Sequence, residues 1–409
     1  MLEAAEVASR YVAVRARTEA LAAPLSPEDA MVQSMPDASP AKWHLAHTTW
    51  FFEEFLLRRW HDARWRPLFN SYYEAAGPRH ARAGRGVLSR PTLDEIRAWR
   101  AAVDDRVLSM LQRAEPRQLE VAFLGTHHEE QHQELLLTDV QHAFWSSELR
   151  PAYRDDEPRS NAGVAPPLRW VAFDEAIVGI GHDRTAREPG FAFDNETHRH
   201  RVLVGAFQLA SRLVTNGEYD AFVADGGYER PELWLSDGWA AVQQHGWRSP
   251  LYWEKDGAAF GLRGVRPRAP NAPVAHVSHY EADAYARWAG ARLATEAEWE
   301  RAAAAQSVRG NFLDEERLAT TAAPRDGAGV TQLFGDAWEW TASAYVPYPG
   351  FRAFDGALGE YNGKFMSGQM VLRGGSCFSP RDHIRPTYRN FFPPQARWQV
   401  SGIRLARDV

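Results

Sequence analysis

The sequence predicts an α+β protein, with a helical bundle at its N-terminal end followed by a loop-rich domain of mixed helix and strand. Three observations support this fold class. Residues 1–150 contain long segments with apolar residues three and four apart, residues 151–168 are polar and rich in proline, and residues 169–409 contain short apolar runs separated by Gly, Pro, Asn and Asp. A chain of 409 residues is long enough for two or three domains.

The N-terminal domain, residues 1–150, contains four segments with helical periodicity. Ser39 before Pro40 predicts an N-cap followed by proline at the first helical position. Thr92 and Glu95 form a capping-box pattern. The expected helices cover residues 4–22, about 40–60, about 92–113 and, after Pro116, about 117–146. Four helices of this length predict a bundle, in which residues 61–91 form the long crossover loop.

The linker, residues 151–168, separates this bundle from a C-terminal domain of residues 169–409. There the apolar runs RWVAFD, VLVGAFQLA and MVLRGG predict strands, because turn-forming residues lie between them. Helical patterns occur at about 215–225 and about 278–304. This alternation of short elements predicts a loop-rich α+β fold.

Composition excludes several classes of protein. Lys and Arg number 47 against 53 Asp and Glu, and no long basic run is present, so we expect no nucleic-acid partner. No uncharged apolar run approaches a membrane span, and acidic residues near the start argue against a signal peptide, so we expect no membrane partner. The single cysteine, Cys377, cannot form an intrachain disulfide, which favours a reducing cytoplasm.

The fourth helical segment contains the sequence His127-His128-Glu129-Glu130-Gln131-His132. His128 and His132 are four residues apart, so both lie on one helical face and can reach one metal ion. The same spacing matches H-E-x-x-H, the zinc metalloprotease signature, in which Glu129 is the general base. The alternative is that Glu129 lies on an ordinary solvated face.

A second histidine pair, His44 and His47, lies on the second helical segment. Either residue can supply a third ligand if the two helices face each other in the bundle. Any one of these histidines alone would more commonly be a hydrogen-bonded structural residue. Two pairs on helices that pack together favour a three-histidine site for iron or zinc, with positions left open for substrates.

Longer blocks of the chain resemble a known family. In the first domain they are SPAKWHLAHTTWFFEEFLL, NSYYEAAGPRH and HHEEQHQELLLTD. In the second they include FAFDNETHRHRV, GEYNGKFMSGQMVLRGGSCFSP and HIRPTYRNFFPP. The chain thereby resembles the iron-dependent sulfoxide synthases of ergothioneine biosynthesis, the EgtB-type enzymes. The resemblance implies a DinB-like four-helix bundle followed by a domain like formylglycine-generating enzyme, a variant of the C-type lectin fold.

The resemblance also implies a reaction and its residues. An enzyme of this family uses Fe(II) and O2 to join a thiol, cysteine or γ-glutamylcysteine, to the imidazole of hercynine, the trimethylated betaine of histidine, as a sulfoxide. The family's iron ligands correspond to His47, His128 and His132, and its imidazole-orienting glutamine corresponds to Gln131. Tyr72 and Tyr73 are the candidates for its catalytic proton donor, the alternative being that one of them only anchors a loop.

The substrate-binding residues are implied in the same way. A permanent cation such as the trimethylammonium group of hercynine binds aromatic faces and short polar groups, which Asn390, Phe391 and Phe392 offer. The second substrate carries a carboxylate or similar anion, so arginines are expected near the site. The candidates lie in the loop after Tyr73 and are Arg79, Arg82 and Arg85, although surface exposure is the more common state for any single arginine.

Three alternatives stay open at the level of sequence. A selenoneine synthase resembles these enzymes closely but takes a selenosugar as its second substrate. A DinB-type zinc hydrolase or thiol transferase fits the bare H-E-x-x-H spacing, and a binding-only lectin-like protein fits the second domain. A formylglycine-generating activity is rejected, because one cysteine cannot reproduce a paired-thiol copper site. The sequence makes no prediction about the oligomeric state.

Overall fold

The computed structural model describes residues 2–156, 163–186, 190–325 and 329–409. It contains two compact units. The first unit consists of Met1–Asp155 and Asp355–Glu360, and the second consists of Asp156–Phe354 and Tyr361–Val409. Residues 157–162 of the expected linker lie outside the described residues.

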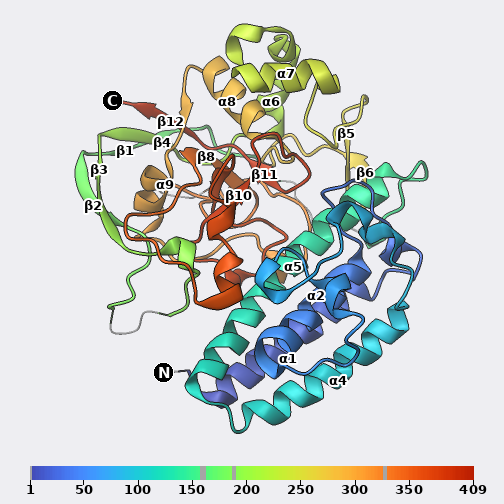
Figure 1. Cartoon of the computed structure of the whole chain (residues 1–409). Helices are drawn as coiled ribbons and strands as arrows, with labels where there is room; N and C mark the ends of the chain where they lie inside the picture. Colours follow the sequence, from blue (N-terminus) through green and yellow to red (C-terminus); the bar gives the residue numbers. More distant parts are fainter. Residues whose placement is uncertain (1, 157–162, 187–189, 326–328) are drawn as a thin grey trace. The chain divides into compact units, whose positions relative to one another are not determined.

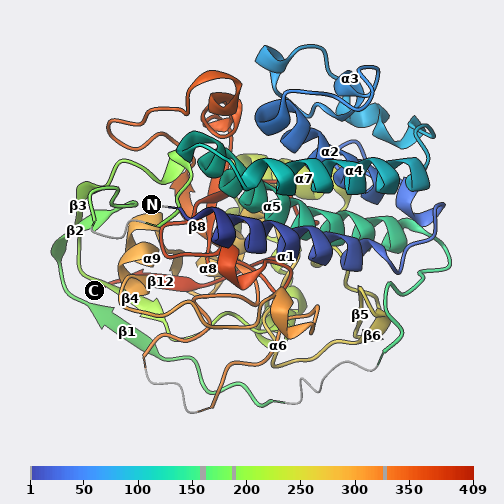
Figure 2. The same ribbon diagram turned by 90° about the horizontal axis from the view of Figure 1, so that it is seen from below.

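The first unit is a bundle of long helices. Its helices are α1 (Ala4–Ala22), α2 (Ala41–Phe52), the short α3 (Arg66–Phe69), α4 (Leu93–Leu111) and α5 (Pro116–Ser146). The four long helices run side by side (Figures 1 and 2), and both α1 and α2 pack against α5. The predicted four-helix bundle is therefore confirmed. No helix in the described part of the chain is long and apolar enough to cross a bilayer.

Local sequence signals explain where these helices begin. Thr92 and Glu95 form the expected capping box of α4, and Pro116 is the first residue of α5. The prediction for α2 was wrong in one detail. Pro40 holds the N-cap position, and the Ser39 hydroxyl does not cap the helix but accepts a hydrogen bond from Arg85. The helix continues as a π-helical turn over Glu53–Leu57 and ends at Arg58, which has a left-handed φ of 51°.

Part of the first unit comes from late in the chain. The sequence analysis placed residues 355–360 in the C-terminal domain, whereas the structure groups Asp355–Glu360 with the bundle. The Glu360 carboxylate accepts hydrogen bonds from the backbone N–H groups of Glu74 and Ala75, at 3.0 and 2.8 Å. These hydrogen bonds attach the late segment to the crossover loop. The sequence did not predict them, because the partners lie 286 and 285 residues apart.

The second unit contains two four-stranded sheets and two hairpins. One sheet has the order β1-β4-β12-β7, and the other has the order β10-β9-β8-β11, in which β11 and β8 are parallel. The hairpins are β2–β3 and β5–β6. The strands are β1 (Trp170–Phe173), β2 (Ala176–Ile180), β3 (His200–Val204), β4 (Phe207–Ala210), β5 (Ala258–Gly261), β6 (Gly264–Pro267), β7 (Arg292–Leu293), β8 (Trp338–Ala344), β9 (Met370–Arg373), β10 (Asn390–Phe392), β11 (Ser401–Gly402) and β12 (Leu405–Asp408).

The helices of the second unit depart from the sequence prediction at two places. They are α6 (Asn216–Ala224), α7 (Ser236–His245), α8 (His279–Trp288) and α9 (Glu296–Ala303). The single helix expected over 278–304 is two helices, because Gly290 adopts a left-handed φ of 65° after α8 and the chain then enters β7. Helix α7 was not anticipated. The α+β character predicted for this half of the chain is confirmed.

Candidate metal centre

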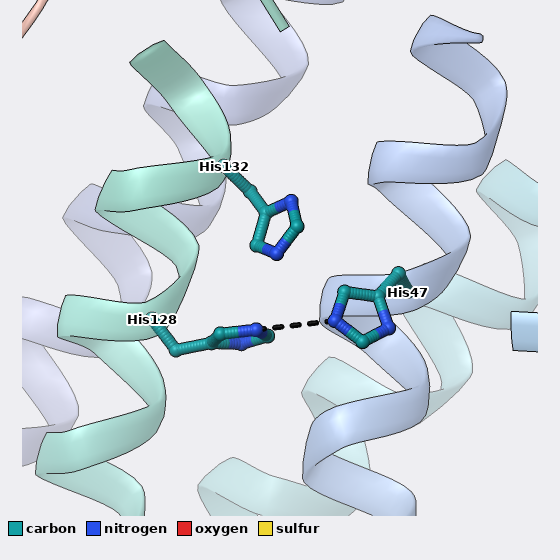
Figure 3. Close-up of side chains that lie close together, drawn as sticks. All are labelled: His47, His128 and His132. Carbon is teal, nitrogen blue, oxygen red and sulfur yellow. Dashed lines mark hydrogen bonds between the residues drawn. The ribbon is translucent and has the colours of Figure 1, made fainter. Parts of the chain in front are cut away.

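Three imidazoles meet inside the helical bundle. His47 comes from α2, and His128 and His132 come from successive turns of α5 (Figure 3). One nitrogen from each ring lies within 4.8 Å of the others, and the Nε2 atoms of His47 and His128 are 3.1 Å apart. The structure thus brings together the three residues that the resemblance implied as ligands.

Aromatic side chains hold these rings in place. The Trp43 indole stacks on His47, with 4.6 Å between ring centroids and 11° between planes, and Trp50 stacks on His47 at 5.5 Å. Phe51 stacks on His128 at 4.5 Å. Sequence reasoning missed this packing, although Trp43, His47 and Trp50 follow one another at spacings of four and three on one helix, which places them on one face.

Burial keeps the three imidazoles neutral. It lowers the pKa of His128 to about 3, and it lowers the pKa of His47 and of His132 well below the usual histidine value, with the neighbouring histidines acting in the same direction. The cluster contains imidazoles alone among the described residues. Neutral imidazole nitrogens are ligands for iron, zinc and similar divalent ions, so this donor set fits a metal that keeps open positions for substrates.

The structure separates His47 from the neighbouring histidine that sequence spacing could not distinguish. His47 turns its Nε2 toward His128, whereas its Nδ1 lies 2.6 Å from the carbonyl oxygen of Phe69. His44 instead lies behind the cluster, with its Nδ1 2.9 Å from Nδ1 of His132 and its Nε2 3.0 Å from Asp139. His127 also lies apart, with its Nδ1 3.2 Å from the Glu130 carboxylate.

Glu129 is neither a general base beside the cluster nor a solvated residue, so both sequence interpretations of it were wrong. Its carboxylate is fully buried, forms an ion pair with Arg15 at 3.0 Å and forms a second with Arg100. Burial by itself raises the pKa of Glu129, but the Arg100 and Arg15 guanidinium groups bring it down to about 2. The residue stays ionised and bound to α1 and α4, away from the histidine face of α5.

The tyrosine pair lies in an ordered part of the crossover loop. Asn70 accepts a hydrogen bond from the Tyr73 backbone N–H at 3.1 Å and donates to the Tyr73 carbonyl at 2.9 Å. The Tyr73 ring is buried, 5.7 Å from Trp50 and 5.0 Å from Phe55. Tyr72 is half-buried and stacks on Tyr73 at 4.7 Å. The pair therefore joins the aromatic layer that contacts His47 through Trp50.

The three candidate arginines differ in how far they are exposed to solvent. Arg79 is exposed and pairs with Glu74 at 2.6 Å, and Arg82 is exposed and donates to the Asp37 carbonyl. Arg85 is 3% exposed, and its guanidinium carbon lies 3.4 Å above the Trp43 ring. Among the residues that the structure describes, no carboxylate forms an ion pair with Arg85. Burial, together with Arg82, lowers its pKa to about 9.

The remaining predicted residues lie on α5 and in the second unit. Gln131 is half-buried on α5, beside His132. Asn390, Phe391 and Phe392 form β10, which pairs with β9. Phe391 stacks on Tyr345 at 4.1 Å, whereas Phe392 packs edge-on against Trp398 at 5.7 Å. Asn390 accepts a hydrogen bond from the Phe391 backbone N–H at 2.9 Å.

A buried ion pair supports β10 from the preceding residue. Arg389 forms two hydrogen bonds of 3.0 Å with the Glu296 carboxylate, one from Nε and one from Nη2. Its guanidinium also lies over the rings of Tyr345 and Tyr348. These contacts fix the start of the strand on which Asn390 and Phe391 lie.

Two family models match the chain. The model of the DinB superfamily matches residues 10–144, and the model of the sulfatase-modifying factor enzyme 1-like domain matches residues 174–324 and 314–409. Together they cover both units of the structure.

Curated hercynine oxygenases match nearly the whole chain, and a formylglycine-generating enzyme matches part of it. The hercynine oxygenase of Mycolicibacterium thermoresistibile is 34% identical over 99% of this chain and 95% of its own length. That of Mycolicibacterium smegmatis is 33% identical over 92% of this chain and 93% of its own. The formylglycine-generating enzyme of Bos taurus is 26% identical over 60% of this chain and 76% of its own. The hercynine oxygenases therefore match the bundle and the second domain together.

Proposed function

Because the chain belongs to the hercynine oxygenase family, we propose that it is a non-haem Fe(II)- and O2-dependent sulfoxide synthase of ergothioneine biosynthesis. Its substrates are hercynine and a thiol, either cysteine or γ-glutamylcysteine. The reaction replaces a C–H bond of the imidazole and the S–H bond of the thiol by a C–S bond, places one oxygen atom on sulfur and releases the other as water. These changes together account for the four electrons that O2 accepts.

The observation that carries this proposal is the group formed by the buried His47 and His128 and the half-buried His132. Each imidazole is neutral, so the three hold a divalent ion without lowering its positive charge. Bound Fe(II) supplies redox chemistry and open positions for both substrates and for O2. The ionised Glu129 is paired with two arginines and is therefore not available as the base that a zinc hydrolase of the H-E-x-x-H type requires.

Arg85 is proposed to bind the carboxylate of the thiol substrate. A buried guanidinium without a carboxylate partner among the described residues is costly, and an incoming carboxylate supplies the missing charge. Trp43 lies against both Arg85 and His47, which places this cation one indole away from the histidine cluster. Arg79 and Arg82 lie earlier in the same loop and are exposed, and Arg79 already pairs with the Glu74 carboxylate.

Gln131 and the residues of β10 are proposed to contact hercynine. Gln131 would orient the imidazole, and Asn390 with Phe391 and Phe392 would contact the trimethylammonium group. The Tyr72–Tyr73 pair would donate the proton that the reduction of oxygen requires. Separate Tyr72→Phe and Tyr73→Phe variants distinguish the two hydroxyls, because only the donor variant loses product formation while still binding hercynine.

The proposal is tested by product analysis. The Fe(II)-loaded protein is given hercynine and O2 with cysteine, γ-glutamylcysteine or a selenosugar in separate reactions, and products are identified by mass while oxygen uptake is recorded. A sulfoxide from either thiol supports the proposal, and the more efficient thiol identifies the donor. Product from the selenosugar alone would make the protein a selenoneine synthase. Absence of oxygen uptake with every donor, in protein that has bound iron, would contradict an oxygenase.

The histidine assignment has its own control. His47→Ala, His128→Ala and His132→Ala should each abolish stoichiometric iron binding and product formation. His142→Ala changes a histidine of the same helix α5 whose Nδ1 lies 2.7 Å from the Ser34 hydroxyl, outside the cluster, and should retain both properties.

A further inference from the structure

A chain of three polar side chains runs from the histidine cluster into the interior of the bundle. His132 Nδ1 lies 2.9 Å from His44 Nδ1, and His44 Nε2 lies 3.0 Å from Oδ2 of Asp139. His44 and Asp139 are 2% and 5% exposed. His44 comes from α2 and Asp139 from α5, so the chain links the same two helices that carry the cluster.

The positions of the protons in this chain follow from its last member. The Asp139 carboxylate oxygen already accepts the Ser39 backbone N–H at 2.8 Å, so it acts as an acceptor toward Nε2 of His44. A neutral His44 therefore carries its proton on Nε2 and has a lone pair on Nδ1. That lone pair accepts the Nδ1–H of His132, which leaves Nε2 of His132 as the unprotonated nitrogen.

The free nitrogen of His132 is the one that a metal requires. In Figure 3 the His132 ring points one nitrogen into the space between His128 and His47, and the other away from it. His47 shows the same arrangement, because its Nδ1 lies 2.6 Å from the Phe69 carbonyl oxygen and its Nε2 lies within the cluster. A fixed acceptor behind a ligand histidine sets both its tautomer and the direction of its ring.

We propose that His44 and Asp139 are positioning residues, which hold His132 with Nε2 directed at the bound metal. The proposal rests on the metal centre put forward above and extends it to two residues that contact neither the metal nor a substrate. It also gives a role to His44, which spacing alone left as an alternative ligand. Ser39 links this chain of side chains to Arg85. Its backbone N–H donates to Asp139, and its hydroxyl accepts a hydrogen bond from Arg85 at 2.8 Å.

Two substitutions of His44 separate positioning from packing. In His44→Gln the side-chain amide can still accept from His132 and donate to Asp139, whereas His44→Leu fills similar space without either hydrogen bond. If His44 positions His132, metal affinity falls in the order wild type, Gln, Leu, with a loss of about 10- to 100-fold for Leu. If His44 only fills space, Leu retains affinity at least as well as Gln does.

The measurement uses the metal alone and does not depend on catalysis. Binding of Fe(II) under anaerobic conditions, and of Co²⁺, is measured by competition with a chelator, and the Co²⁺ absorption spectrum reports ligand geometry. The histidine ¹⁵N spectrum of the metal-free protein reports which His132 nitrogen carries the proton. Asp139→Asn keeps an acceptor oxygen without the charge and should give an intermediate loss. Denaturant unfolding identifies any variant that fails to fold, and His142→Ala serves as the control.

The positioning role of His44 and the metal centre itself fail on different results. Equal metal affinity and an unchanged His132 tautomer in folded His44→Leu would overturn the positioning role while leaving the metal centre intact. Wild-type protein that binds metal no more tightly than His132→Ala would instead overturn the metal centre on which the proposed function depends.

Discussion

The indole of Trp43 stacks on the imidazole of His47, with 4.6 Å between ring centroids and an interplanar angle of 11°. The Arg85 guanidinium lies 3.4 Å from the centre of the same indole. Both groups therefore pack against the same indole. One side chain thus contacts both a candidate metal ligand and a buried cation.

Arg85→Met should weaken binding of the thiol substrate far more than binding of iron. Hydrogen bonds to charged groups contribute about 1.5–3 kcal/mol, so KM for the thiol should rise by about 10- to 100-fold. KM for hercynine should change little. Steady-state oxygen uptake with each substrate varied in turn provides the measurement, and Arg64→Met, an exposed arginine paired with Asp62, is the control. An unchanged KM for the thiol would remove Arg85 from the substrate site.

Glu129→Gln should destabilise the protein rather than stop its chemistry. Removing the buried charge leaves Arg15 paired only with Asp104 and Arg100 paired only with Glu19, both of which are partly exposed, and breaking a buried ion pair costs about 3–5 kcal/mol. The free energy of unfolding in urea measures the loss, with the exposed Glu148→Gln as control. Turnover per folded, iron-loaded molecule should persist. Lost turnover at unchanged stability would restore Glu129 as a catalytic base.

His279 should make the protein less stable in acid. Burial lowers its pKa to about 4, and the ring is 5% exposed and lies edge-on to Trp340 at 5.7 Å. Between about pH 6.5 and pH 4 the unfolded chain binds a proton at this position and the folded chain does not, so stability is present above pH 6.5 and falls as pH decreases.

The slope attributable to one such histidine is at most about 1.4 kcal/mol per pH unit. His279→Phe should therefore reduce the difference in unfolding free energy between pH 8 and pH 5, whereas the exposed His245→Gln should not change it. Urea unfolding curves at the two pH values provide the comparison. The same difference in His279→Phe as in the wild type would show that this ring is protonated equally in the folded and unfolded states.

Glu360→Ala should loosen the loop that carries Tyr72 and Tyr73. The substitution removes the acceptors of two backbone N–H groups, those of Glu74 and Ala75. At about 1 kcal/mol for each hydrogen bond, amide exchange in residues 70–77 should become about 10-fold faster or more. Hydrogen–deuterium exchange followed by mass spectrometry tests this, with the exposed Asp355→Ala of the same segment as control. If product formation slows together with faster exchange, the loop geometry supports the proton donor.

Features that depend on neighbouring residues could be predicted from the sequence. The capping box of Thr92 and Glu95 begins α4 as expected, and the four-residue spacing of His128 and His132 places both rings on one face of α5. The choice between His44 and His47 could not be made from spacing, because the two lie three residues apart on the same helical face. Both contact α5, but only the Nε2 of His47 lies among the cluster nitrogens, whereas His44 contacts His132 from behind and faces Asp139.

The sequence by itself therefore determined the helical bundle, the α+β character of the second half and the histidine pair on one helix, because hydrogen bonds and periodicity within a few residues encode these features. The tertiary structure alone decided that Glu129 faces two arginines, that Arg85 is buried whereas Arg79 and Arg82 are exposed, and that His44 joins Asp139 behind His132. The contacts of Glu129 and His44 join residues 29 to 114 positions apart in the sequence. The burial of Arg85 depends on the path of an irregular loop. Burial and pairing at such distances depend on how helices pack, which no local pattern specifies.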